Sequence, residues 1–192
     1  MQPLIDNART FGQCPEEFAK LAEGQSPQVL FITCSDSRVV PALITGARPG
    51  ELFELRTAGN IVPPYISTTP TAEAATIEYA VEVLGVRDIV VCGHSHCGAV
   101  GALVRGDDLA AVPAVRGWLA QATPRPAGAA ADPAVTEGVQ SHVLAQVLRL
   151  RSYPCVAGKL AEGRLALHAW YYEVHTGAVR AHVASTDTFE AL

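Results

Sequence analysis

The chain has 192 residues, 49% of them hydrophobic and 17% charged, and it carries a net charge of −5 at pH 7. This length is enough to bury a substantial core, and we predict that residues 1–192 form a single domain. The acidic balance, with no basic cluster, argues against a nucleic-acid partner, and the lack of a long apolar run argues against a membrane protein.

The N-terminal segment contains a weak helical pattern and no targeting signal. Residues 8–23 place apolar side chains among charged ones at helical spacing, and we predict an amphipathic helix there. Residues 1–9 lack the charged and apolar regions of a signal peptide. An odd number of cysteines at irregular spacing argues against a disulfide framework and for a reducing cytoplasm. The cysteines are Cys14, Cys34, Cys92, Cys97 and Cys155.

The first predicted strand is followed closely by side chains that can carry chemistry. Before it, Gln25 lies in a turn-forming segment, and on pattern alone it is a solvated turn residue. Residues 29–33 are apolar and β-branched, which predicts a buried strand. Cys34 lies at the end of this strand, and Asp36 and Arg38 follow it at steps of two.

The next part of the chain predicts a short helix and a strand. The helix is expected over residues 39–45 and ends at Gly46. Residues 52–56 alternate in the manner of a strand, with Phe53 and Leu55 on one side.

A second helix is predicted ahead of the next strand. It spans residues 71–84, follows a proline-rich loop over residues 63–70 and is capped by Gly85. On its pattern alone, Tyr79 is a half-buried residue of this helix.

The stretch that follows combines a strand, a tight turn and a helix. Residues 89–91 form a β-branched apolar run, Gly93 breaks the pattern, and helical spacing resumes from Gly98. Three residues of the expected turn suit a soft metal. They are His94, His96 and Cys97.

Two further helices are predicted over residues 109–119 and 135–150, with a Pro/Ala/Gly loop over residues 122–134 between them. We interpret His142 as a surface or hydrogen-bonded histidine rather than a ligand. The second helix carries an apolar stripe of Val139, Val143, Leu144, Val147 and Leu148.

The chain ends in a predicted hairpin. A strand over residues 165–174 turns at Gly177 into a strand over residues 179–183. Three histidines here have no partner at a recognisable spacing, and we interpret them as structural. They are His168, His175 and His182.

The two strand-end motifs meet if their strands are neighbours in one parallel sheet. Cys34 would then lie beside His94 and Cys97 at the carboxyl edge, where α/β proteins bind ligands. Zinc accepts a Cys2His set in catalytic sites and keeps one position open. The competing interpretation is that a buried cysteine at a strand end is a small core residue.

Two other ligand assignments compete with this one. His96 competes with His94, and the motif favours His94, with His96 exposed near the cleft. Cys92 would complete a structural site with four protein ligands, but its place within a strand should point it into the core.

Cys34-Ser-Asp-Ser-Arg38, taken with Gly93-His-Ser-His-Cys-Gly98, resembles the β-class carbonic anhydrases in order and in separation. The resemblance covers most of the chain and is weakest from about 105 to 135. It implies an α/β fold in which helices flank a mainly parallel central sheet. Other similar segments are Gly24-Gln-Ser-Pro27, Pro49-Gly-Glu-Leu-Phe53, Asn60-Ile-Val-Pro-Pro-Tyr65, Ile77-Glu-Tyr-Ala80 and Leu167-His-Ala-Trp-Tyr-Tyr172.

The resemblance also implies roles for particular residues. One Zn2+ per chain would be held by Cys34, His94 and Cys97. Arg38 would hold Asp36 away from the metal, so that Asp36 accepts a hydrogen bond from zinc-bound hydroxide. The implied substrate pocket consists of Gln25, Phe53, Ala58, Tyr79 and Gly98.

The implied activity is the reversible hydration of CO2 to bicarbonate and a proton, by attack of zinc-bound hydroxide on CO2. The family implies a homodimer or a higher even homo-oligomer, with each site at a subunit interface and Tyr79 reaching the partner's cleft. Two alternatives stay open, a CS2 or COS hydrolase on the same scaffold and a non-catalytic zinc-binding or scaffolding protein.

Within the family, the chain resembles the plant-like subgroup with an open zinc site. The bicarbonate-inhibited subgroup uses a Trp, an Arg and a Tyr. Here Arg56 and Tyr172 match, but Phe31 replaces the Trp and lacks its N–H donor. Thr57 and Gly59 also depart from the usual residues, which affects hydrogen bonding near the expected dimer interface.

Overall fold

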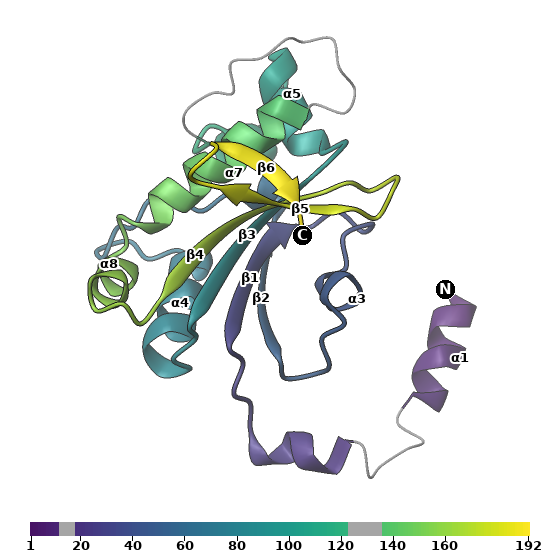
Figure 1. Cartoon of the computed structure of the whole chain (residues 1–192). Coiled ribbons are helices and arrows are strands. Elements are labelled where there is room, and N and C mark those ends of the chain that lie inside the picture. The colour runs from purple at the N-terminus through teal and green to yellow at the C-terminus, as the bar shows by residue number, and fades with distance from the viewer. Residues whose placement is uncertain (12–17, 123–135) are drawn as a thin grey trace.

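A six-stranded sheet forms the centre of the computed structural model, which describes residues 1–11, 18–122 and 136–192 (Figure 1). The strand order in space is β2-β1-β3-β4-β5-β6. The strands are β1 Val29–Cys34, β2 Leu52–Thr57, β3 Asp88–His94, β4 Ala166–Tyr172, β5 Val179–Val183 and β6 Thr188–Ala191.

The four strands β2, β1, β3 and β4 are parallel, and β5 and β6 add two antiparallel strands at one edge. Cys34 at the end of β1 is level with Thr57 of β2, and Thr33 is level with Cys92 of β3. The carboxyl ends of β1 and β3 therefore meet, as the predicted ligand set requires. The predicted α/β fold with a mainly parallel sheet is confirmed, while β6 was not predicted.

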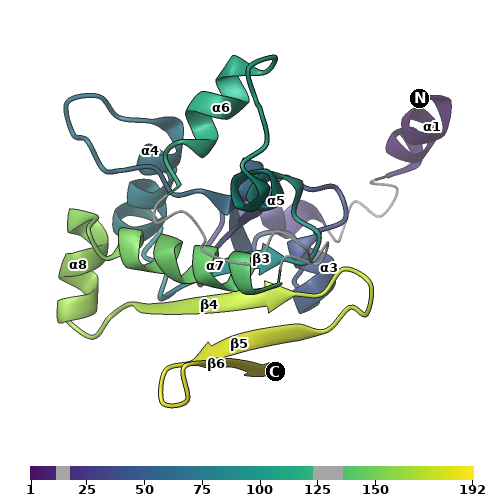
Figure 2. The ribbon, with the colours of Figure 1, turned by 90° about the horizontal axis from the view of Figure 1, so that it is seen from above.

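Helices α4, α7 and α8 cover one face of the parallel strands (Figures 1 and 2). The helices are α1 Gln2–Thr10, α3 Pro41–Thr45, α4 Ala72–Glu78, α5 Gly98–Arg105, α6 Pro113–Leu119, α7 Thr136–Leu150 and α8 Pro154–Ala161. The short turns η1 Lys20–Glu23 and η2 Ala58–Asn60 are 3-10 helices, and η3 Tyr79–Val83 is a π-helical continuation of α4.

The two faces of the sheet bury different sets of side chains. Along β1, Leu30, Ile32 and Cys34 point toward the covering helices and belong to the main core cluster. Phe31 points to the opposite face, where it packs in a smaller cluster with Val90 and Cys92. This alternation follows from the period-two geometry of a strand. Cys92 is fully buried on the face opposite Cys34, which confirms that it points into a core.

Proline and glycine set several helix boundaries. Pro41 begins α3, and the left-handed Gly46 ends it, close to the predicted limits. Pro113 begins α6, so the helix predicted over residues 109–119 is four residues too long at its start. A proline has no N–H for the preceding turn and restricts the residue before it, which is why the helix starts there.

The N-terminal prediction of one helix over residues 8–23 is wrong at its start. α1 occupies residues 2–10. The hydroxyl of its last residue, Thr10, donates hydrogen bonds to the carbonyls of Asp6 and Asn7. Phe11 then adopts an extended conformation, so the helix ends. The rest of that prediction lies partly outside the described residues, as does Cys14.

Gly93 does not break the third strand, which is longer than the predicted residues 89–91. A Cβ at Gly93 would lie 2.5 Å from Cγ2 of Val143 and 2.6 Å from Cγ1 of Val139. Glycine therefore allows α7 to approach the sheet, and the strand continues to His94 as its last residue. In the sequence this glycine suggested a turn, but it marks the close approach of α7 to β3.

The predicted apolar stripe of α7 is wrong at Leu148, which is 64% exposed. Val139 and Val143 are buried as expected, and so is Leu150, which was not predicted, but His142 and Gln146 share their buried side. Leu148 lies five residues after Val143, which rotates it away from the packed side of the helix. Polar contacts of His142 and Gln146 with the chain after β2 explain this helix orientation.

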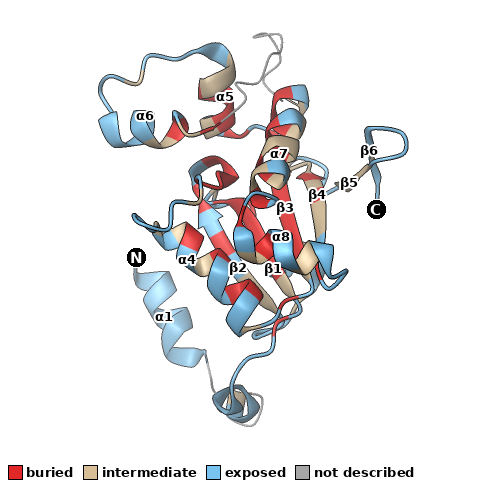
Figure 3. Cartoon of the chain, turned by 90° about the vertical axis from the view of Figure 1, so that its left-hand side faces the viewer, coloured by how far each residue is buried: buried red, intermediate tan, exposed pale blue. Residues whose placement is uncertain are grey.

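α1 stands apart from this core. None of its residues is buried, and its apolar Leu4 is 66% exposed (Figure 3). In the ribbon view the helix extends away from the sheet (Figure 1). Within the described ranges, no helix combines the length and the apolar character needed to span a lipid bilayer.

Candidate metal centre

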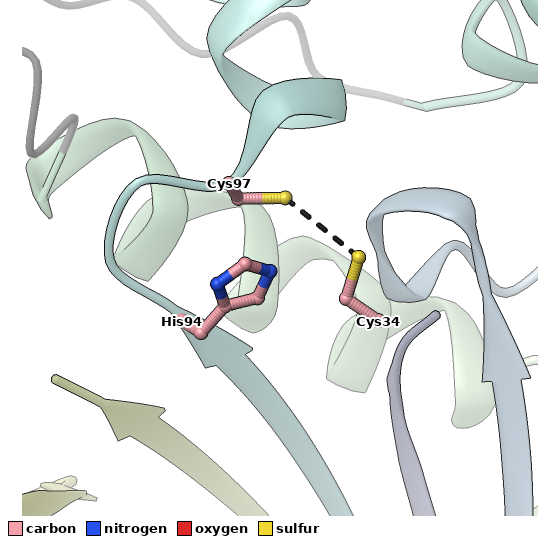
Figure 4. A group of neighbouring side chains, drawn as sticks. All are labelled: Cys34, His94 and Cys97. Atoms are coloured by element: carbon pink, nitrogen blue, oxygen red, sulfur yellow. Dashed lines mark hydrogen bonds between the residues drawn. The ribbon is translucent and has the colours of Figure 1, made fainter. Parts of the chain in front are cut away.

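Three side chains with metal-binding atoms meet where β1 and β3 end. The sulfurs of Cys34 and Cys97 and a ring nitrogen of His94 all lie within 4.8 Å of one another, and all three residues are buried. The two sulfurs are 4.0 Å apart. Figure 4 shows the two thiol groups and the imidazole turned toward a common centre.

Each of the three residues is placed by the end of a regular element. Cys34 is the last residue of β1, His94 is the last residue of β3, and Cys97 immediately precedes α5. Between the last two, Ser95 donates its N–H to the carbonyl of Tyr172 at 2.9 Å and accepts the N–H of Val174 on its hydroxyl. The turn is thereby fixed to the end of β4.

His96 lies outside this group. It is exposed and adopts a left-handed backbone conformation with φ of +57°, which is uncommon for a residue other than glycine. Its ring lies 5.9 Å from the ring of His175, centre to centre. The structure therefore brings His94, and not His96, to Cys34 and Cys97, as the motif predicted.

The imidazole of His94 is oriented for coordination. Its Nδ1 lies 2.9 Å from the carbonyl oxygen of Ser95. A carbonyl only accepts, so Nδ1 carries the proton and Nε2 carries a free lone pair. Nε2 is buried and has no hydrogen-bond partner among the described residues. A histidine that ligates a metal commonly donates its other N–H in this way.

The two cysteines share one proton in the metal-free chain. The hydrogen bond from the Cys97 thiol, with further help from the Gly59 and Asp36 N–H groups, lowers the pKa of Cys34 to about 4 against the effect of burial. The thiolate of Cys34 and burial in turn raise the pKa of Cys97. A cation between the sulfurs would replace that proton, because thiolates are the form that binds metal.

Asp36 and Arg38 form a bidentate pair at the edge of the group. Nε of Arg38 donates to Oδ1 of Asp36 at 2.9 Å, and a terminal nitrogen donates to Oδ2 at 2.7 Å. The hydrogen-bonded guanidinium holds the pKa of the Asp36 carboxyl well below its usual range. Oδ2 is also 3.8 Å from Nε2 of His94, so the carboxylate borders the metal-binding atoms.

Arg56 holds the loop that carries this pair. Its guanidinium donates to the carbonyls of Cys34, Asp36 and Val39, the last at 2.7 Å. Phe31, at the position of the family's Trp, packs edge-on against Trp170 with ring centres 5.8 Å apart. Nε and one terminal nitrogen of Arg56 are thus engaged by the protein's own backbone.

Thr57 and Gly59, which differ from the usual residues of the resembled family, each make contacts that explain the residue present. The Thr57 hydroxyl donates to the carbonyl of Ile61 at 3.2 Å and closes the η2 turn. Gly59 has φ of +72°, and a Cβ on it would lie 3.1 Å from Cβ of Ala99. Its N–H donates to Sγ of Cys34 at 3.4 Å. The sequence pattern did not reveal this contact.

The predicted substrate residues separate into two groups. Ala58 adjoins Gly59, and Gly98 adjoins Cys97, so both lie beside the metal-binding atoms. The other three lie elsewhere on this chain, as their positions on the strands show.

Phe53 lies four residues before Thr57 on β2, which is roughly 13 Å along a strand. Tyr79 accompanies it, with ring centres 6.0 Å apart, and is 45% exposed. Gln25 is exposed and precedes the amino end of β1, whereas Cys34 is at the carboxyl end. One chain alone does not bring these three residues to the metal-binding group.

The remaining histidines differ in their surroundings. His142 is 1% exposed, and its Nε2 lies 2.8 Å from the carbonyl oxygen of Gly59, so it is a hydrogen-bonded histidine rather than a surface one. His168 pairs with Asp88 at 2.7 Å, and His182 pairs with Asp187 at 3.0 Å. The partners of His142 and His168 are far apart from them in the sequence, so spacing could not reveal them, whereas Asp187 follows His182 across the turn between β5 and β6.

Known proteins resemble this chain over most of its length. A family model described as carbonic anhydrase matches residues 29–179. A carbonic anhydrase from Pseudomonas aeruginosa is 48% identical over 181 residues, which is 91% of this chain and 82% of that protein.

Solved structures agree with this match. The β-carbonic anhydrase CcaA has a TM-score of 0.92 and 36% identity to this chain and covers 100% of it, with 99% of its own chain matched. One of two tetrameric β-carbonic anhydrases from the ascomycete Sordaria macrospora has a TM-score of 0.77 and 31% identity, covering 94% of this chain and 92% of its own.

Proposed function

The chain belongs to the β-class carbonic anhydrases, and from this premise we propose that it hydrates CO2 reversibly with a zinc ion held by Cys34, His94 and Cys97. The observation that supports the ligand set most strongly is the meeting of their two sulfurs and one ring nitrogen within 4.8 Å. The family's activity is CO2 hydration, and the roles of individual residues below are our proposal.

The donor set fits zinc. Ligand atoms around a tetrahedral zinc, with bonds of roughly 2.0–2.3 Å, stand roughly 3.3–3.8 Å apart. The sulfurs of Cys34 and Cys97 are 4.0 Å apart, close to that range. The buried Nε2 of His94 lacks a hydrogen-bond partner in the described part of the chain, so it has a lone pair to give. Three protein ligands leave a fourth position free.

A zinc ion bound there would act as a Lewis acid that lowers the pKa of a water molecule enough to provide hydroxide near neutral pH. The chain's own residues would prepare that position. Arg38 engages both oxygens of Asp36 and so keeps this carboxylate from becoming a fourth ligand. Asp36, ionised and adjacent to His94, would accept a hydrogen bond from the attacking water and orient it toward CO2.

We propose that the fourth position is open near neutral pH, as in the plant-like subgroup. The bidentate Asp36–Arg38 pair supports this, because a carboxylate engaged on both oxygens must break those bonds to reach the metal. Arg56 supports it as well. Its guanidinium is bound to backbone carbonyls, and Phe31 has no N–H to offer to a regulatory bicarbonate.

The substrate pocket would be formed by two chains. Ala58 and Gly98 would border CO2 on the chain that holds the metal, and Gln25, Phe53 and Tyr79 would come from a partner. A homodimer or a higher even homo-oligomer satisfies this requirement. The Sordaria macrospora relatives are described as tetrameric, and α1, with no buried residue, offers apolar side chains such as Leu4 to a second copy.

The enzyme would work in the cytoplasm. The four cysteines in the described part of the chain are all free, which fits a reducing compartment.

Stopped-flow measurement of CO2 hydration, before and after chelation, tests the proposed function. We expect activity to disappear with the metal and to return when zinc is added back. Full activity after complete zinc removal would contradict the proposal. Parallel assays with CS2 and COS separate CO2 hydration from the related hydrolase activities.

A further inference from the structure

A row of polar side chains on α7 holds the chain segment next to the metal-binding group. Nε2 of His142 lies 2.8 Å from the carbonyl oxygen of Gly59. One turn later, Oε1 of Gln146 accepts the N–H of Val62 at 2.9 Å. Both side chains are almost completely buried. The helix thus contacts the η2 segment at two backbone positions.

Gly59 is fixed at both of its backbone polar groups. Its carbonyl accepts from His142, and its N–H donates to Sγ of Cys34 at 3.4 Å. Between these two bonds the residue has φ of +72° and ψ of 23°, a left-handed conformation that glycine adopts without strain. The N–H and the carbonyl belong to the two peptide units that meet at the Gly59 Cα, so the bond from His142 restrains the unit next to the one that carries the N–H.

Stability alone does not account for His142. Burial lowers its pKa, so the imidazole is neutral, and the carbonyl acceptor places the one proton on Nε2. Nδ1 is then an acceptor with no partner among the described residues. A buried polar group with an unused acceptor is costly, and an apolar residue would avoid that cost.

We propose that His142 is a positioning residue for the metal centre, which acts through Gly59 to keep an N–H group on the sulfur of Cys34. This inference rests on the proposed zinc site. A hydrogen bond to a metal-bound thiolate withdraws electron density from the sulfur and fixes its orientation. Groups that orient metal ligands typically affect metal affinity by roughly 10–100-fold when they are removed.

Three full-length variants separate this role from a purely structural one. His142→Leu removes the donor, and His142→Gln returns an N–H at the position of Nε2. Gln146→Leu is the matched control, since it removes an equally buried polar group from the same helix and segment without contacting Gly59. The probes are Zn2+ affinity, measured by competition with a chromophoric chelator, and the thiolate-to-metal charge-transfer band of the Cd2+-loaded protein.

We expect His142→Leu to weaken Zn2+ binding by about tenfold and to move the charge-transfer band to longer wavelength, because the sulfur regains electron density. His142→Gln should restore both, and Gln146→Leu should change neither. If His142→Leu folds and matches the parent in both measurements, or if Gln146→Leu causes the same changes, the inference is wrong.

A measurement on the unmodified protein covers the case in which His142→Leu does not fold. In the protein loaded with NMR-active cadmium, we expect scalar coupling between the Gly59 amide proton and the metal, transmitted through the sulfur. Absence of this coupling would overturn the inference while leaving the metal site intact. Failure of the parent protein to bind either ion would instead contradict the proposed function.

Discussion

The two ends of the parallel strands carry different parts of the expected active site. At the carboxyl ends, Cys34, His94 and Cys97 meet within one chain. Toward the amino ends lie Gln25 and the Phe53–Tyr79 pair, on positions that leave them far from those ligands. The difference teaches that one folded chain brings the three candidate ligands together, whereas the proposed substrate pocket requires a second chain.

The first prediction concerns the carboxyl ends of the strands, where one chain supplies all three candidate ligands. Cys34→Ser should lose nearly all zinc. CO2 hydration should fall by more than the roughly hundredfold loss that follows removal of a group hydrogen-bonded to a metal ligand. Cys92→Ser is the matched control, because Cys92 is equally buried but faces the other side of the sheet. Metal analysis and stopped-flow kinetics provide the measurements. Full zinc occupancy in Cys34→Ser would contradict the ligand assignment.

The second prediction concerns the carboxylate at that same end. Arg38→Leu frees Asp36 to approach the metal, so we expect kcat/KM to fall by about 10–100-fold while zinc is retained. Arg48→Leu is the control, because it breaks another two-bond Arg–carboxylate pair, in which the exposed Arg48 donates twice to Oε1 of Glu51. Equal activity in the two variants would show that Asp36 needs no partner to stay off the metal.

The third prediction tests whether Gln25, near the amino ends of the strands, contributes to the site of a partner chain. Gln25→Ala should lower activity by about tenfold with zinc unchanged, and the nearby exposed Gln28→Ala should not. Mixed dimers of Gln25→Ala with Cys34→Ser should recover one complete site, because the intact metal centre would receive Gln25 from the other chain. Mixed dimers no more active than their parents would place Gln25 outside a shared site.

The smallest expected effect concerns His142 and pH. Burial lowers its pKa below the ordinary 6.5, so the unfolded chain takes up the proton more readily than the folded one. A neutral His142 makes its full contribution to the free energy of unfolding above the ordinary pKa of 6.5. That contribution is lost as the pH falls below 6.5, by at most about 1.4 kcal/mol per pH unit. Metal-free His142→Gln should therefore lose less unfolding free energy than the parent between pH 7 and pH 5 in chemical denaturation. Identical pH slopes would mean that the folded protein protonates His142 without cost.

The sequence predicted the meeting of Cys34, His94 and Cys97 because the first two end strands that have a local signal. β-branched runs before Cys34 and His94 marked two buried strands, and parallel pairing brought their ends together. The prediction failed where a residue's role depends on a distant element. Gly93 resembles a turn residue in the sequence, but it is a point of close approach for α7.

The same limit applies to polar residues. No spacing rule links Gly59 to Cys34 or His142 to Gly59, since the first pair meets through the pairing of β2 with β1 and the second through the packing of α7 over the sheet. Likewise, the helical pattern placed Leu148 in the core, because periodicity alone did not show that α7 turns His142 and Gln146 toward the η2 segment. In the proposed site, the placement of Gln25 depends further on a second chain, which one sequence does not describe.

The most direct test of the metal centre is a crystal structure of the zinc-loaded protein near pH 7, with anomalous scattering recorded at the zinc edge. We predict one anomalous peak per chain, bonded to Cys34, His94 and Cys97, with Arg38 still holding Asp36. An Asp36 oxygen at bonding distance from the zinc with Arg38 released, or a peak away from these three residues, would contradict the account.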